Sequence, residues 1–100
     1  MALVLNSGNF LPTVKLRLPQ EVTVGAASAQ SSAFSIGTKL IRIVSTTACR
    51  FEIGSNLTAT ATSALLPAGV VEFTEVSPSD KIAVIQESGA GKLSIAECIL

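Results

Sequence analysis

Apolar and polar residues alternate along much of this chain, and elsewhere apolar residues form short runs bounded by Gly, Pro, Asn and Ser. No window repeats its apolar residues at the period of a helix, and β-branched residues are abundant, so the pattern predicts strands. We expect strands at 13–18, 21–24, 33–36, 38–45, 49–53, 70–76, 81–87 and 92–97, the second short and the third weak.

Two of these segments have apolar residues at every second position. Segment 13–18 alternates three apolar side chains with two basic ones, which is typical of a strand with one buried face. Pro19 is expected to stop this strand. In 70–76 we expect Val71 and Phe73 to point inward.

Two other segments are apolar on both faces, which indicates central strands of two packed sheets. They are 38–45 and 81–87. The turn at 46–47 is expected to close a hairpin between 38–45 and 49–53, and the turn at 88–91 a second hairpin near the C-terminus.

Small and polar residues mark the connections. Segments 25–32 and 54–63 are expected to be loops, and 67–69 and 77–80 tight turns. About eight short strands at a spacing of roughly ten residues indicate one domain, residues 1–100, with a jelly-roll-like β-sandwich fold. An immunoglobulin-like sandwich is the second choice.

The composition indicates that a partner covers part of the surface. Hydrophobic residues make up 48% of the chain and charged residues 14%, against about 25% charged residues in typical domains. No run approaches the roughly 18 apolar residues of a membrane span, and the N-terminus lacks the basic region of a signal peptide. We therefore expect assembly with other proteins, although Ala, Ser and Thr could equally fill the surface of a small β-protein.

The charges exclude other partners. Net charge is +0, the seven basic residues are scattered, and the chain has no Trp or Tyr to stack on bases. Binding to nucleic acid or to a membrane surface is therefore not expected.

The chain has no His, which removes the usual general base and most zinc sites. The acidic residues are expected to lie mostly on solvated strand faces or in turns: Glu21, Glu52, Glu72, Glu75, Asp80, Glu87 and Glu97. Segment 88–92 fails the pattern of a phosphate-binding loop. We expect no enzyme activity, cofactor, metal or small-molecule substrate; a hydrolase using paired carboxylates is the weakest of three functional hypotheses.

Cys49 and Cys98 lie in strand-like runs, and their spacing is not that of a metal site. We expect two buried free thiols and an intracellular origin, with a disulfide left open.

The apolar terminal segments are candidates for subunit contact. An N-terminal arm at 1–12 is expected either to reach a neighbour or to pack on the chain's own core. The predicted contact residues are Leu3, Val4, Leu5, Leu65 and Leu66.

Four stretches, within residues 38–97, resemble small proteins from the virion gene clusters of tailed bacteriophages. They are a core strand at 41–47, the loop Gly-Ser-Asn-Leu-Thr-Ala-Thr-Ala-Thr-Ser at 54–63, the turn Leu-Leu-Pro-Ala-Gly-Val at 65–70, and the strand Lys-Ile-Ala-Val-Ile at 81–85. The resemblance implies a structural protein of the virion, assembled in the host cytoplasm: a head decoration or cement protein. Such proteins act as dimers or trimers on a major capsid protein, and no catalytic residues come with the family.

A ligand- or receptor-binding β-sandwich module of a phage tail or adhesin is the alternative function. Sugar-binding sites usually stack their ligand on Trp or Tyr, and this chain has neither. The structural role is therefore preferred.

Overall fold

The computed structural model describes residues 15–99, and this part of the chain contains strands and no helix. The strands are β1 (Lys15–Val24), β2 (Ala29–Gln30), β3 (Leu40–Ser45), β4 (Cys49–Gly54), β5 (Ala64–Leu66), β6 (Glu72–Glu75), β7 (Lys81–Gln86) and β8 (Gly91–Ile99). The predicted all-β class is confirmed. The N-terminal arm predicted at 1–12 lies outside the described residues.

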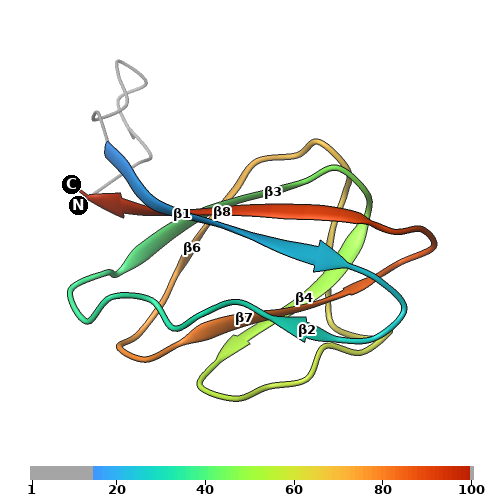
Figure 1. The fold of residues 1–100 in the computed structure, drawn as a ribbon, viewed down its shortest axis with the longest axis horizontal. Coiled ribbons are helices and arrows are strands. Elements are labelled where there is room, and N and C mark those ends of the chain that lie inside the picture. The colour runs from blue at the N-terminus through green and yellow to red at the C-terminus, as the bar shows by residue number, and fades with distance from the viewer. Residues whose placement is uncertain (1–14, 100) are drawn as a thin grey trace, which may run out of the picture.

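The strands form two antiparallel sheets that pack as a sandwich (Figure 1). Sheet A has the order β1-β8-β3-β6, and sheet B has the order β2-β7-β4-β5. Each strand of the first half pairs with its counterpart from the second half: β1 with β8, β2 with β7, β3 with β6, and β4 with β5. This is one long hairpin wrapped around itself, which is the topology of a jelly roll. The jelly-roll prediction is therefore confirmed, and the immunoglobulin-like order is not found.

The core lies between the sheets and is built from alternate residues of the strands. β3 and β7 are interior strands of sheets A and B, as their two apolar faces predicted. The cluster of buried side chains is Val22, Val24, Phe34, Ile41, Ile43, Cys49, Leu66, Val76, Ile82, Val84, Leu93 and Ile95. Both sheets contribute to it, so neither can hold its inner face without the other.

The two predicted hairpins are wrong. The turn after β3 and the turn after β7 each carry the chain from one sheet to the other, and the single pairing between consecutive strands is that of β4 with β5. The two crossing turns run beside each other instead: Thr46 N–H donates to Lys92 C=O over 3.0 Å, and Glu87 N–H donates to Ala48 C=O over 3.1 Å. A short turn between two strands does not reveal whether the strands share a sheet.

β1 also differs from its prediction, because it continues through Pro19 to Val24. Its register with β8 shifts between Arg17 and Gln20, and Leu18 has a positive φ of 50° at this bulge. Pro19 is tolerated because β1 is an edge strand, where a missing N–H breaks no pairing on the outer side.

The connections were predicted in part. Ala29 and Gln30 form β2 within the expected loop 25–32, whereas 33–36 is not a strand. The expected turn at 67–69 is present, with Gly69 at φ 74° and Val70 N–H donating to Pro67 C=O. The turn at 77–80 is also present, closed by Asp80 N–H donating to Ser77 C=O over 3.1 Å.

Candidate assembly surface

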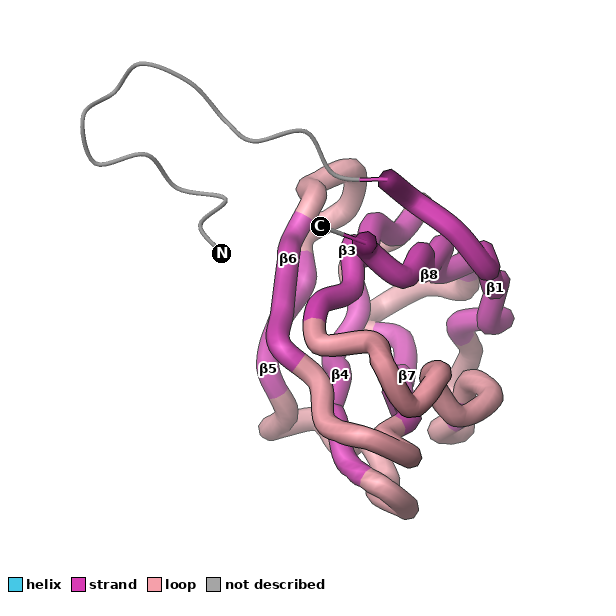
Figure 2. Tube along the Cα trace, turned by 90° about the vertical axis from the view of Figure 1, so that its left-hand side faces the viewer, coloured by secondary structure: helices cyan, strands magenta, loops and turns pink. Residues whose placement is uncertain are grey.

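The two edge strands of sheet A lie on opposite sides of the molecule, and each has a segment of exposed side chains. β1 is at one end of the sheet order and β6 is at the other, and Figure 2 shows them on the two flanks of the sandwich. Every residue of the segment 15–18 of β1 is exposed, and so are Glu72, Phe73 and Glu75 of β6. These flanks are named here the β1 edge (15–18) and the β6 edge (70–75).

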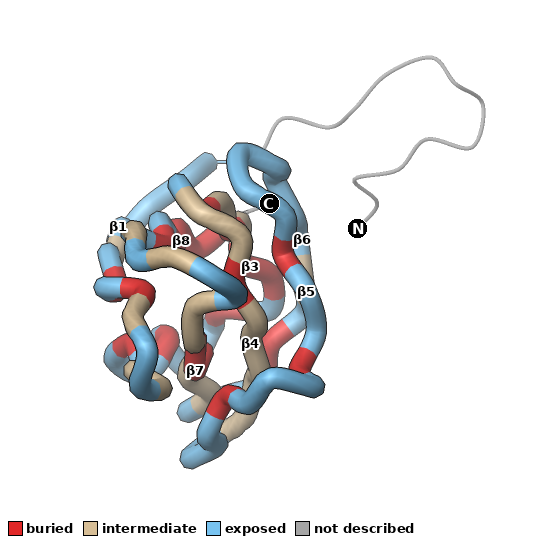
Figure 3. Tube along the Cα trace, turned by 90° about the vertical axis from the view of Figure 1, so that its right-hand side faces the viewer, coloured by how far each residue is buried: buried red, intermediate tan, exposed pale blue. Residues whose placement is uncertain are grey.

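Exposed apolar side chains gather on these flanks. Eight large apolar residues are exposed within residues 15–99: Leu16, Leu18, Ile36, Leu57, Leu65, Val70, Val71 and Phe73. Two of them lie on the β1 edge and three on the β6 edge, and Leu65 lies on the neighbouring strand β5. Figure 3 shows how little of β5 and β6 is buried. Apolar groups concentrated in this way mark contact surfaces on soluble proteins.

The prediction that Val71 and Phe73 point inward is wrong. Phe73 lies opposite Arg42, whereas Thr74 lies opposite Ile41. Because Ile41 is fully buried in the core, Thr74 faces the core and Phe73 faces outward, with 41% of its surface exposed. Val71, two residues earlier, is also exposed. The alternation was read correctly, but the strand presents its apolar side to solvent.

The outer face of sheet A between the two edges carries Arg42 and the buried side chains of Ala96 and Cys98. Leu16 lies opposite Cys98 in the pairing of β1 with β8. Ala96 lies opposite Arg42, and Arg42 opposite Phe73, across the next row of the sheet. Leu16 and Leu18, which were expected on the buried face of their strand, are 48% and 44% exposed because they lie on this outer edge.

The two edges carry charges of opposite sign. Lys15 and Arg17 are exposed on the β1 edge, and Glu72 and Glu75 on the β6 edge. No ion pair joins any of these four side chains to another residue within 15–99. Each edge therefore offers apolar side chains together with charges that have no partner among the described residues.

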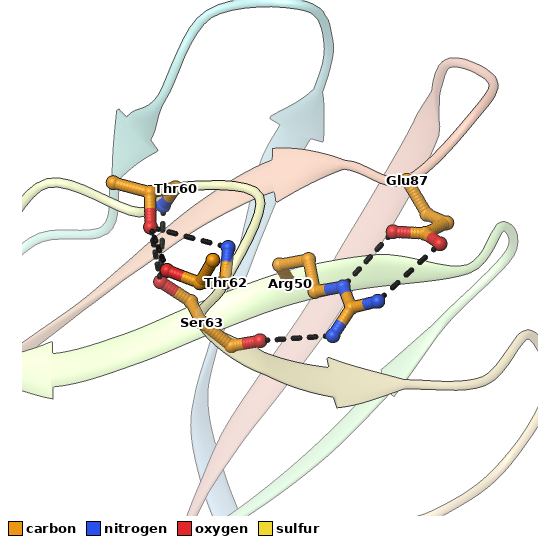
Figure 4. A network of polar contacts seen from close by, with 5 residues as sticks. All are labelled: Arg50, Thr60, Thr62, Ser63 and Glu87. Atoms are coloured by element: carbon orange, nitrogen blue, oxygen red, sulfur yellow. Dashed lines mark hydrogen bonds and ion pairs between the residues drawn. The ribbon is translucent and has the colours of Figure 1, made fainter.

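On the outer face of sheet B, Arg50 is paired within the chain (Figure 4), whereas Glu52 and Lys81 form no ion pair among residues 15–99. Arg50 donates from Nε to Glu87 Oε1 over 2.9 Å and from an Nη to Ser63 C=O over 3.2 Å. This contact holds the pKa of the Glu87 carboxyl below its ordinary value and raises the pKa of Arg50, through the hydrogen bond first and the charge attraction second.

The loop after β4 is also bound to the body of the molecule. Gln30 Nε2 donates to Leu57 C=O over 2.8 Å, and Ala59 N–H donates to Ser28 Oγ over 2.9 Å. Within the loop, Thr60 N–H donates to Ser63 Oγ over 3.0 Å. The first two bonds anchor the segment 55–63 to β2 and to the connection that precedes it.

Glu97 is the exception among the predicted solvated acids, since it is 2% exposed. Thr38 Oγ1 donates to its Oε1, and Ser35 N–H donates to its Oε2 over 3.2 Å. The carboxyl thus fixes the connection between β2 and β3 from the last strand. Alternation on β8 places Glu97 on the same face as Leu93 and Ile95, a signal that was present in the sequence.

Both cysteines are buried free thiols, as predicted. Cys49 belongs to the core cluster, whereas Cys98 lies opposite Leu16 on the outer face of sheet A. The two side chains are therefore on different faces of the sandwich. Burial is the main cause that raises the pKa of both thiols, so neither is an activated nucleophile.

The five predicted contact residues have different outcomes. Leu3, Val4 and Leu5 lie outside the described residues. Leu65 is 47% exposed on the outer side of β5, so its contact role stays a prediction. Leu66 is fully buried in the core cluster and has no surface to offer a neighbour, so its proposed contact role is wrong.

Sequence reasoning did not predict that Leu16 and Phe73 are exposed. Both alternate with polar neighbours as core residues do, and only the strand order shows that they lie on outer edges. The high apolar content and low charge of the sequence indicated exposed apolar residues, but composition does not show where along the chain they lie.

Among residues 15–99 no group of three or more His, Cys, Asp or Glu side chains is placed to hold a metal ion. No helix in the same range is long and apolar enough to cross a membrane.

Comparison of the chain with protein-family models, with curated proteins and with solved structures finds no match. The fold is therefore assigned from the strand order alone.

Proposed function

We propose that this protein is a structural subunit of a virion, a head decoration or cement protein that associates with copies of itself and braces a capsid lattice. The observation that supports it is the presence, along the two edges of sheet A, of exposed apolar side chains and of charges without an ion-pair partner among residues 15–99. Surface of this kind is stabilised when a partner covers it.

The fold is compatible with this role, since jelly rolls occur in viral capsid proteins, although they also occur in lectins. The chain's resemblance to phage virion proteins favours the capsid over the lectin role. The lack of Trp and Tyr disfavours a sugar-binding site. The protein is proposed to act by contact and to catalyse no reaction.

The test is the mass of the full chain in solution, measured by light scattering after size exclusion across a dilution series. We expect a discrete species at a multiple of 10.3 kDa, which dissociates only on dilution. A single 10.3 kDa species up to the highest soluble concentration would overturn self-association. Binding to a glycan array by such a monomer would favour the ligand-binding alternative.

A further inference from the structure

The free edges of sheet A run in opposite directions. β1 is antiparallel to β8, β8 to β3, and β3 to β6. A second copy placed beside the first in the same orientation would therefore bring its β1 antiparallel to β6 of the first. The alternation of strand directions would continue across the boundary without a break.

Both edges are short. β6 has 4 residues, and the register of β1 with β8 shifts between Arg17 and Gln20. Pro19 has no N–H to donate, so pairing along the outer side of β1 is weakened beyond the segment 15–18. Each edge thus offers one short row of free backbone groups, which is the template for adding a strand.

From these features we infer that copies of the chain associate head to tail, with the β1 edge of one copy paired to the β6 edge of the next in one continuous sheet. This rests on the proposed function only in that the chain assembles with itself. Among the registers that keep the outer face continuous, we assign the one that puts Leu16 opposite Phe73.

The charges favour this register. It puts Arg17 opposite Glu72 on the other side of the shared sheet, with Lys15 as the diagonal neighbour of Glu72. In its own sheet Arg17 is aligned with Glu97, and Glu72 is aligned with Ile43. Both side chains therefore belong to the inner-facing rows. Both are nevertheless exposed, because they lie on edge strands. Opposite charges across a strand pair stabilise it.

Pairing between identical edges is disfavoured. Two β1 edges joined in one continuous sheet would put Lys15 opposite Arg17, or Arg17 opposite its own copy. Pairing of two β6 edges would place either Glu72 or Glu75 at the position diagonal to the same residue of the other copy. Like charges at these positions destabilise a strand pair, so the pairing of β1 with β6 is the one with complementary chemistry.

A head-to-tail contact uses two different patches on each copy, so it does not end at a dimer. It generates a ring of three or more copies when the rotation closes, and an open chain when it does not. Closure into a ring leaves no free edge in sheet A, which removes the surface on which further strands could add.

The test uses two variants of the full chain, Leu16→Asp and Phe73→Asp, each of which blocks one edge. Each variant alone is expected to lose every species above 10.3 kDa at a concentration where the wild type is assembled. An equimolar mixture is expected to form a complex of one copy of each and nothing larger. In that complex the intact β6 edge of the first variant pairs with the intact β1 edge of the second.

The matched control is Ile36→Asp, which places the same charge at a residue 82% exposed on a connecting loop and should keep the wild-type mass. Far-ultraviolet circular dichroism confirms that all variants fold. Assembly by either blocked variant alone, or a mixture that stays monomeric, would overturn head-to-tail pairing. The proposed function would still stand if the wild type assembles. A monomeric wild type would instead overturn the self-association that forms part of the proposed function.

Discussion

The outer faces of the two sheets differ in the contacts that their polar and apolar side chains make. On sheet B, Arg50 is paired with Glu87 and the loop 55–63 is hydrogen-bonded to β2 and to its own turn. On sheet A, Phe73 and Leu16 are exposed, and Arg42 between them forms no ion pair within residues 15–99. The comparison shows that the exposed large apolar side chains of sheet A lie along its β1 and β6 edges, which is where the proposed partner is placed.

The largest expected change in the free energy of unfolding distinguishes the buried side of β5 in sheet B from its exposed side. Leu66→Ala removes a fully buried side chain and should lower the free energy of unfolding by about 2–5 kcal/mol. Leu65→Ala, at the adjacent exposed position, should change it by less than about 0.5 kcal/mol. Urea unfolding curves of both variants measure this. Equal losses would mean that the outer side of β5 is packed as tightly as the core.

A smaller effect should follow from the carboxyl on the inner side of sheet A. Glu97→Ala leaves Ser35 N–H and Thr38 Oγ1 without their acceptor and should cost about 1–3 kcal/mol of unfolding free energy. Glu97→Gln keeps one acceptor oxygen and should cost less. Thermal unfolding at neutral pH compares the two. An alanine variant as stable as the wild type would show that water replaces the carboxyl without loss.

The smallest effect concerns the ion pair on sheet B. Arg50→Ala should raise the pKa of Glu87 toward its ordinary value, as followed by carbon-13 chemical shifts of its carboxyl during a pH titration. Because Arg50 lowers the folded-state pKa of Glu87, the stability it adds is present above the unfolded pKa of glutamate. That stability is lost as pH falls through the folded pKa. Lys92→Ala serves as the control, and a pKa unchanged in Arg50→Ala would refute the pairing in solution.

The strands that were predicted best from the sequence are those whose side chains are stable only when both faces of the strand are buried. The runs around Ile43 and Val84 are apolar on both sides, and such runs are stable only between neighbours on both edges and under a second layer. Their central positions in the two sheets follow from that requirement. The turn at Gly69 was predicted for an equally local reason, since its positive φ suits glycine.

The candidate surface could not be predicted, because it depends on which strands end up at the edges. Phe73 and Leu66 both follow local apolar patterns, yet one is exposed and the other is fully buried. The hairpin predictions failed for the same reason, since a turn of a few residues can join two strands within a sheet or between sheets. Local patterns report which residues are apolar and do not report the sheet order.

The pairing of β1 with β8 also decides when this chain can fold. β8 is interior in sheet A, between the first strand and β3, so that sheet has no centre until Gly91–Ile99 has left the ribosome. Most native contacts then form between segments far apart in sequence, which makes folding slow and leaves strands unpaired during synthesis. A growing chain with Ile41, Ile43 and Ile82 still uncovered would need protection from aggregation, so premature termination before β8 should yield insoluble fragments and no smaller folded domain.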